Sequence, residues 1–316
     1  MASDIPTLAV IIVSYNTRQI TLNCLESVWA ELGRLPFSAR VWVVDNASSD
    51  GSAEAIAERF PGLYLIRSEE NLGFAKGTNL ALAHIAQEVS PPAFVLFLNP
   101  DTLVQPGALG AMVAFLQGHP HVGAVGAQLF YEDGRFQHGA FRFPTLAMAF
   151  FDFWPLHHRL LDSPLNGRYG RRLYAQGKPF PIDHPLGAAM MVRWEALKGV
   201  GWFDEGFFMY CEEIDWCLRA KAAGWEIYCV PEARIVHLSG QSTRQFREKM
   251  FVALWRSRYR LFEKHYGPFY RWAVRRIVRA GVRHEMGRVA RALKKGELSA
   301  EEAERRFVAY HQVLEM

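Results

Sequence analysis

Three apolar runs set the pattern of the first third of the chain: LAVIIV at 8–13, VWVV at 41–44 and FVLFL at 94–98. None of them alternates with polar residues, which is typical of strands buried on both faces of a parallel sheet. Segments with helical periodicity separate the runs, at 20–30, 52–60, 78–88 and 107–117. This alternation predicts an α/β fold with a Rossmann-like, doubly wound and mostly parallel sheet over residues 8–130.

Polar residues follow each apolar run directly. They are Ser14-Tyr15-Asn16, Asp45-Asn46 and Asn99-Pro100-Asp101. In open α/β sheets, ligands bind beyond the carboxyl ends of the strands, where the strand order reverses. We therefore predict that the three clusters share one pocket. The alternative is ordinary turn chemistry, because Asp, Asn and Ser favour turns in any protein.

The rest of the chain divides by composition. Residues 131–180 are rich in proline and aromatic residues and predict an inserted loop or lid segment. Strand-like runs return at 188–192 and 227–230, and a helical pattern begins at Arg244. Ser299 and Glu302 have the spacing of a capping box. The predicted domains are a catalytic domain 1–243, with a nucleotide-binding half 1–130, the insertion 131–180 and an acceptor half 181–243, and a helical extension 244–316.

Charge is concentrated near the end of the chain. The formal net charge is +4, yet residues 268–295 alone hold nine Lys or Arg against the single acid Glu285. Apolar residues recur through this stretch at helical spacing, so it predicts a basic amphipathic helix that lies on anionic lipid. The alternative is a solvated helix that packs on the domain or on a second subunit as a homodimer. No nucleic-acid motif accompanies the charge, which disfavours nucleic acid as a partner.

Composition limits where the protein works. Half of the 316 residues are hydrophobic, which is enough for a core, and the four cysteines lack CxxC spacing. The start Met1-Ala2-Ser3-Asp4 lacks the segments of an export signal, and no apolar run approaches the roughly 18 residues of a membrane span. We expect free thiols and a cytoplasmic location, peripheral on the inner face of the plasma membrane through the basic helix.

Two of the polar clusters suggest donor chemistry. Asp45 ends a buried strand, where a carboxylate accepts the imide N–H of a pyrimidine or a ribose hydroxyl. The stretch 71–79 carries two glycines before a helix, which permits close backbone approach to a polar ligand. Asp101 offers oxygen to Mg²⁺ or Mn²⁺, although an ordinary Asn-Pro-Asp turn has the same sequence.

A second constellation lies at 203–219. A helix over 213–223 places Glu212 and Glu213 at its N-terminus, where the helix dipole favours an ionised carboxylate suited to a general base. Helix-start electrostatics alone is the competing explanation. Asp215 and Arg219, four residues apart, predict an ion pair that fixes the helix. His237, after a strand-like run, is by itself more often structural than a ligand.

Eight segments in order resemble a known family. They are VSYN, VVDNASSDGS, NLGFAKGTN, LNPD, GAAMMVR, GWFDEGFFMYCEEIDWCLR, VHLSGQS and RYRLFEKHYG. This order is similar to the family-2 inverting glycosyltransferases of the GT-A fold, and within them to the bacterial rhamnosyltransferase-like group that builds cell-surface polysaccharides. The resemblance covers about residues 8–267 and leaves the basic tail outside it.

The resemblance implies roles for the polar clusters. Ser14, Tyr15 and Asn16 would line the nucleotide pocket. Asp45 would take the pyrimidine imide with Asn46 near the ribose. Gly73 and Asn79 would shape the wall beside base and ribose.

The resemblance also implies a metal site and a base. Asn99-Pro100-Asp101 stands where the family has its metal-binding DxD signature, with Asp101 as ligand and His237 as a further ligand. Glu213 stands where the family usually has an aspartate base, and Glu212 is its rival. Asn99 in place of an acid weakens the metal site by one negative charge, and Glu213 in place of Asp adds a methylene to the base.

The function that the resemblance implies is transfer of a sugar, with inversion, from a dTDP- or UDP-sugar such as dTDP-rhamnose to a glycan or lipid-linked acceptor, assisted by Mg²⁺ or Mn²⁺. A non-catalytic nucleotide-binding or membrane-scaffold subunit is the alternative. A sugar nucleotidyltransferase is disfavoured, because VSYNTRQ lacks the glycines of a phosphate loop after the first strand.

Overall fold

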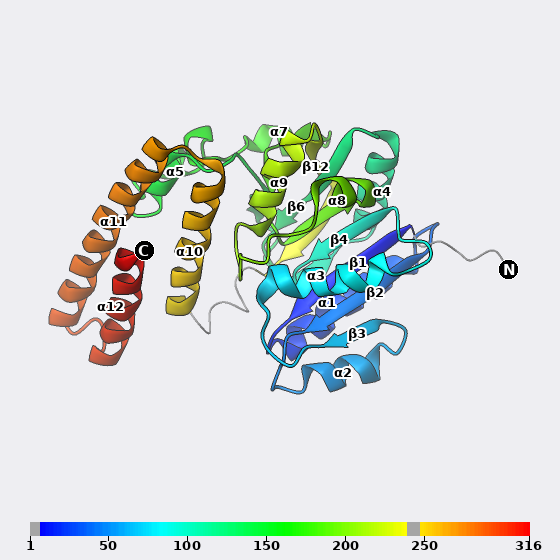
Figure 1. Ribbon diagram of the computed structural model, residues 1–316, viewed down its shortest axis with the longest axis horizontal. Coiled ribbons are helices and arrows are strands. Elements are labelled where there is room, and N and C mark those ends of the chain that lie inside the picture. Colours follow the sequence, from blue (N-terminus) through cyan, green and yellow to red (C-terminus); the bar gives the residue numbers. More distant parts are fainter. Residues whose placement is uncertain (1–6, 239–246) are drawn as a thin grey trace. The chain divides into compact units, whose positions relative to one another are not determined.

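A computed structural model describes residues 7–238 and 247–316, and its contacts divide them into two compact units (Figure 1). The first unit comprises 7–141, 171–208 and 212–238, and the second comprises 142–170, 209–211 and 247–316. The predicted domain boundary at 243/244 and the residues Ser239–Ser242 of the VHLSGQS segment lie outside the described residues. The insertion 131–180 is thus shared between the two units, and the predicted domain bounds stay a prediction.

The predicted parallel strands form one half of the sheet in the first unit. They are β1 (Leu8–Ser14), β2 (Ala39–Asp45), β3 (Tyr64–Arg67) and β4 (Phe94–Leu98). Their order is β3-β2-β1-β4, so the strand order reverses between β1 and β4. Ser14 pairs with Asp45, and Ile12 pairs with Leu98, so the three polar clusters leave the sheet at the same edge.

Later strands extend the sheet. The path continues through β11 (Ala189–Arg193), β6 (Val122–Phe130), β12 (Glu226–His237) and β5 (Thr102–Val104). Strand β11 runs antiparallel to β4 and β6, whereas β12 runs parallel to β6. Short strands β7 (Phe136–Gln137) and β9 (Phe180–Pro181) complete ten strands, and β8 (Ala140–Phe141) pairs with β10 (His184–Pro185).

Helices cover both faces of this sheet, as a doubly wound fold requires. They are α1 (Arg18–Leu32), α2 (Ser52–Arg59), α3 (Gly73–Ala86), α4 (Ala108–Gly118), α7 (Arg171–Ala175), α8 (Trp194–Val200) and α9 (Glu212–Ala222). Leu8, Val10 and Ile12 share one core cluster with residues of α1, α2 and α4. Val13 points to the opposite face, because a Cβ on Gly77 of α3 would lie 3.1 Å from its Cγ1.

Helix α3 begins five residues before the predicted start at residue 78. Gly73 adopts φ +75°, which glycine reaches without steric cost, and its N–H donates to Asn71 Oδ1 at 3.0 Å. The low helix propensity of Gly73 and Gly77 explains why the sequence pattern placed the start too late.

The second unit is helical. It comprises α5 (Leu146–Phe151), α6 (His158–Leu161), the 3-10 turn η1 (Pro164–Asn166), α10 (Arg247–His265), α11 (Pro268–Lys294) and α12 (Ala300–Glu315). The aromatic residues of the insertion explain why 142–170 joins this unit: Phe153 stacks on Trp255 of α10, with centroids 5.3 Å apart. The predicted basic helix is confirmed as α11. Among residues 7–238 and 247–316, no helix combines the length and low polarity that crossing a membrane requires.

Two local predictions were right in part or in full. Ser299 accepts the N–H of Glu302 at 3.2 Å, but the Glu302 carboxylate pairs with Arg306 at 2.6 Å, so only half of the capping box forms. All four cysteines are free thiols, and each is buried.

Glycines of α11 provide a paired test of packing in the second unit. A Cβ on Gly281 would collide with the ring of Phe153, whereas a Cβ on Gly287 would meet nothing within 4 Å. Gly281→Ala should lower the free energy of unfolding by about 1–3 kcal/mol through overpacking. Gly287→Ala should raise it by about 0.5–1 kcal/mol through helix propensity. Urea unfolding measures both, and equal effects of the two variants would contradict the packing of Phe153 against α11.

Candidate active site

The loop after β1 is fastened to the turn after β2. Asn16, at φ +51°, donates its backbone N–H to Ser48 Oγ at 2.9 Å, and its side-chain oxygen accepts the N–H of Ser49 at 2.8 Å. The Ser14 hydroxyl lies fully inside, bonded to Thr17 and Thr21 at 3.2 and 2.9 Å. Tyr15 is 37% exposed at the rim. Asn16 and Ser14 therefore position the loop, and Tyr15 is free to contact a ligand.

Asp45 presents an unsatisfied acceptor at the end of β2. Its carboxylate is 3% exposed. Oδ2 accepts the Ser48 N–H at 3.0 Å, and Oδ1 is buried with no hydrogen-bond partner. A buried acceptor in this condition costs free energy until a donor reaches it. Asn46 beside it donates to the Gly73 carbonyl at 2.9 Å, and its own oxygen is likewise buried and unpartnered.

Gly73 and Asn79 of α3 hold a neighbouring loop in place. A Cβ on Gly73 would overlap the Phe208 carbonyl, which accepts the Phe74 N–H at 2.8 Å. The Asn79 amide donates to the Phe203 carbonyl at 2.8 Å and accepts the Phe203 N–H at 3.2 Å. Gly73 and Asn79 therefore hold the 203–208 loop against α3. The close backbone contact at Gly73 is possible because glycine has no side chain.

Asp101 and His237 meet at the edge of the sheet. Both side chains are buried, and Asp101 Oδ1 lies 3.4 Å from His237 Nε2. Gln137 Oε1, an acceptor, lies 3.3 Å from His237 Nδ1, which can donate to it in the tautomer with the proton on Nδ1. In that tautomer the lone pair of Nε2 faces a carboxylate oxygen, and a cation held by the two would satisfy both atoms.

The distance between Asp101 Oδ1 and His237 Nε2 suits coordination of one ion by both atoms. Two ligands about 2.1 Å from a metal, in adjacent octahedral positions, lie about 3 Å apart. In the part of the chain that the structure describes, no three His, Cys, Asp or Glu side chains gather to hold a metal by themselves. Such a two-residue site matches Mg²⁺ or Mn²⁺ bound together with substrate phosphates and water, as Mg²⁺ commonly is.

A chain of contacts joins the Asn99 loop to the predicted base. The N–H of Asn99 donates to the Ala188 carbonyl at 2.9 Å. Gly187 precedes Ala188, and a Cβ built on it would lie 3.4 Å from the carboxyl carbon of Glu213. The start of α9 thus lies against the segment that bonds to the Asn99 loop.

Burial of charge is the main feature of the start of α9. Glu212 and Glu213 are 5% and 8% exposed, and Tyr210 and Cys211 just before them both adopt φ +69°. Positive φ at two successive non-glycine residues stores backbone strain, which is frequent near active sites. Burial, and after it the negative charge of Glu213, raises the pKa of Glu212 well above its ordinary value of 4.5. Proton binding is thus stronger at Glu212 in the folded protein than in the unfolded chain.

The predicted pair Asp215–Arg219 is confirmed. Arg219 Nε lies 2.9 Å from the fully buried Asp215 carboxylate. The two terminal nitrogens of Arg219 donate to the carbonyls of Val200 and Trp202 at 2.7 and 2.8 Å. This network fixes α9 to the loop before it and so sets the direction of the two glutamates.

Three supporting residues had no sequence signal strong enough to find them. Gln137 lies on a two-residue strand, and its role depends on pairing of β7 with β6, far from β12 in sequence. Gly187 and Ser48 belong to predicted motifs, but neither residue type identifies a partner 26 or 32 positions away. A glycine before a strand does hint at close approach of another side chain.

The fold is that of the GT-A glycosyltransferases. A mannosyltransferase from Pyrobaculum calidifontis, solved with GDP-mannose and Mn²⁺, superposes with TM-score 0.57 at 18% identity, covering 98% of this chain and 84% of that one. GalNAc-T7, solved with UDP, GalNAc and Mn²⁺, gives TM-score 0.54 at 17% identity over 74% of this chain and 43% of that longer one.

The family follows from the sequence match. Residues 9–198 match the model of glycosyl transferase family 2, so the chain belongs to that family and is a transferase enzyme. It is similar to N-acetylglucosaminyl-diphospho-decaprenol L-rhamnosyltransferase of Mycobacterium tuberculosis, 28% identical over 74% of this chain and 79% of that protein. Rhamnosyltransferase WbbL of Escherichia coli is 27% identical over 77% of this chain and 87% of that protein.

The raised pKa of Glu212 predicts a pH dependence of stability. Below pH 4.5 the carboxyl is protonated in both states; as the pH rises from there through the raised folded pKa, stability is lost. Glu212→Gln removes this loss and should raise the free energy of unfolding by about 1–3 kcal/mol at alkaline pH, with little gain in acid. Urea unfolding across a pH series measures it. The matched control is Glu58→Gln, an exposed position of α2, and parallel curves for Glu212→Gln and wild type would refute the burial argument.

Proposed function

We propose that this enzyme is an inverting glycosyltransferase that moves a sugar from a dTDP- or UDP-sugar, with dTDP-rhamnose as the preferred donor, to an acceptor hydroxyl. The acceptor is a glycan or a lipid-linked glycan in the synthesis of cell-surface polysaccharide or glycolipid. The names of the similar bacterial proteins support rhamnose and a diphospho-lipid acceptor.

The observation that carries the proposal is the buried, unpartnered oxygen of Asp45 at the end of β2. It lies on the strand next to the point where the strand order reverses, which is where α/β sheets bind ligands. The imide N–H of uracil or thymine is a donor of the right kind for it, and the free oxygen of Asn46 suits a ribose hydroxyl. Tyr15 and the 203–208 loop on Gly73 and Asn79 are proposed to close the pocket around the nucleotide.

Asp101 and His237 are the proposed ligands of Mg²⁺ or Mn²⁺. A bound divalent cation neutralises the charge that develops on a diphosphate leaving group. Asn99 contributes no charge, so the ion relies on one carboxylate, one imidazole and the donor's own phosphates. The Gln137 oxygen can accept from Nδ1, and that tautomer would leave Nε2 available to the cation.

Glu213 is the proposed general base, with Glu212 beside it. Burial, and after it the negative charge of Glu213, raises the pKa of Glu212 and so favours the neutral form of Glu212. Glu213 takes the proton of the acceptor hydroxyl as that oxygen bonds to the anomeric carbon from the face opposite the diphosphate. The bond from that carbon to the diphosphate oxygen breaks in the same step, and configuration inverts without an enzyme nucleophile.

Helix α11 is proposed to hold the enzyme at the inner face of the plasma membrane. Phe269 and Trp272, 73% and 57% exposed, stack with centroids 6.0 Å apart, and Arg276 lies over the Trp272 ring at 5.7 Å. Exposed aromatics beside arginines suit an anionic lipid interface. A second copy of the chain docked through the C-terminal helices is the competing occupant. Sedimentation of the protein with anionic vesicles that weakens as salt is added, without a change of oligomeric state, would support the membrane over the second copy.

A non-catalytic nucleotide-binding or scaffold subunit is the alternative function. The two departures from the family pattern, Asn99 and Glu213, favour it. It predicts nucleotide binding without any transfer of sugar.

Calorimetric titration with UDP, dTDP and GDP, with and without Mn²⁺, tests donor recognition. Binding of a pyrimidine diphosphate should require Mn²⁺ and should be lost in Asp101→Ala, because that carboxylate would hold the cation that neutralises the phosphates. Asp45→Ala should weaken the binding of every pyrimidine diphosphate about tenfold or more, since a hydrogen bond to the carboxylate is removed. Glu58→Gln is the control. Absence of binding to all three nucleotides would overturn the proposed function and leave the fold unaffected.

Glu213→Gln tests the base. Transfer should fall by about 10²–10⁴-fold, the usual contribution of general-base assistance, while donor affinity stays the same. Steady-state kinetics with calorimetry separates the two quantities. A loss of donor affinity as large as the loss of turnover would remove Glu213 from the role, and an equal loss only in Glu212→Gln would assign it to Glu212.

A further inference from the structure

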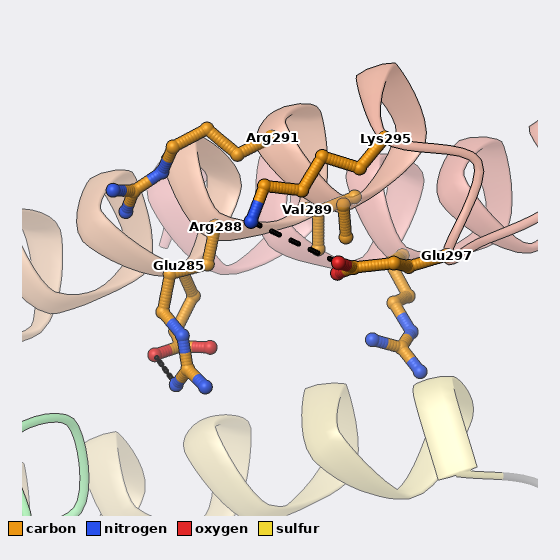
Figure 2. Close-up of a pocket in the computed structure, with 8 residues that line it drawn as sticks. Glu285, Arg288, Val289, Arg291, Lys295 and Glu297 are labelled. Carbon is orange, nitrogen blue, oxygen red and sulfur yellow. Dashed lines mark hydrogen bonds and ion pairs between the residues drawn. The ribbon is translucent and has the colours of Figure 1, made fainter.

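A basic pocket lies between the last turns of α11 and helix α12, at the opposite end of α11 from Phe269 and Trp272. Its volume is about 380 Å³. Four cations line it, Arg288, Arg291, Lys295 and Arg306, against two carboxylates, Glu285 and Glu297. Val289 and Ala292 form its apolar part (Figure 2).

The acids near the pocket leave its cations incompletely paired. Arg288 pairs with Glu285 at 2.9 Å and Arg306 with Glu302 at 2.6 Å, each along its own helix. Lys295 Nζ lies 3.8 Å from Glu297, at the limit of an ion pair. In the described part of the chain Arg291 pairs with no carboxylate, and its Nε donates to the Gly287 carbonyl at 3.1 Å.

Complementing the helix dipole does not explain this grouping. The negative end of α11 attracts cations only near its last turn, which accounts for Arg291 and for Lys295 at the C-cap. Arg288 lies a turn earlier, and Arg306 comes from the middle of another helix. All four nevertheless line one pocket, where an anion would offset their mutual repulsion.

We propose that this pocket binds a phosphate group, with Arg291 and Lys295 as its principal ligands. The planar fork of Arg291 matches phosphate oxygens, and the Lys295 amine adds a second charge. Surface pairs such as Arg288–Glu285 contribute little stability, so Arg288 can turn to the ligand at small cost. The phosphate belongs either to a lipid headgroup or to a soluble phosphate compound. This proposal is independent of the donor site.

Inorganic pyrophosphate is the first probe, titrated into the full chain in EDTA so that no metal supports the donor site. Arg291→Gln/Lys295→Gln should bind it about tenfold or more weakly than wild type. The control Arg279→Gln/Arg283→Gln removes the same charge from exposed positions of α11 outside the pocket lining and should bind like wild type. Hydrogen exchange should show protection of 285–306 on binding. No saturable binding, or equal loss in both double variants, would overturn the proposal.

Phosphatidylcholine vesicles with and without phosphatidic acid identify the source of the phosphate. A larger loss of vesicle binding in the pocket variant than in its control would assign the site to a lipid headgroup. Equal losses, with pyrophosphate binding still specific to the pocket, would assign it to a soluble phosphate. Sugar transfer to a soluble acceptor should stay unchanged in both variants, so failure here and failure of the transferase proposal are distinguishable.

Discussion

The alignment of the carboxyl ends of β1, β2 and β4 is the constraint on which the site depends. Because Ser14 pairs with Asp45 and Ile12 with Leu98, the loops after these strands leave the sheet together. Strand β12 ends at the same edge and brings His237 to Asp101. Backbone hydrogen bonds of the sheet thus place side chains that lie far apart in the sequence of the first unit.

Buried polar atoms without partners mark where this alignment serves something other than stability. Oδ1 of Asp45, the oxygen of Asn46 and one oxygen of Glu212 lack hydrogen bonds in the interior. Each destabilises the fold, since burial takes the oxygen away from water and no protein donor bonds to it. Such atoms occur elsewhere among the described residues too, Trp42 Nε1 among them, but Asp45 and Asn46 stand at the carboxyl end of β2, where α/β sheets bind ligands.

The sequence was informative where one local pattern decides the outcome. Continuous apolar runs predict β1, β2 and β4 because strands buried on both faces need no alternation, and the i,i+4 spacing predicts the Asp215–Arg219 pair. Prediction from the sequence failed where the structure of a segment depends on residues elsewhere in the chain. The start of α3 depends on a glycine at positive φ that fits against Phe208. The grouping of 142–170 with the C-terminal helices depends on Phe153 and Trp255, about a hundred positions apart. The role of Gln137 depends on pairing between strands.

Charge balance gives one departure from the family pattern, Asn99, a physical interpretation. The N–H of Asn99 donates to the Ala188 carbonyl, and a Cβ built on the neighbouring Gly187 would lie 3.4 Å from the carboxyl carbon of Glu213, so one short segment joins the Asn99 loop to the start of α9. Burial and the negative charge of Glu213 already raise the pKa of Glu212 there, so further negative charge close by would be unfavourable. An asparagine in place of an acid keeps the hydrogen bond to Ala188, which uses only the backbone, and adds no negative charge to this part of the chain. On the proposed mechanism, it also leaves the cation with one carboxylate fewer, so the donor's phosphates would have to supply more of the negative charge that holds the ion.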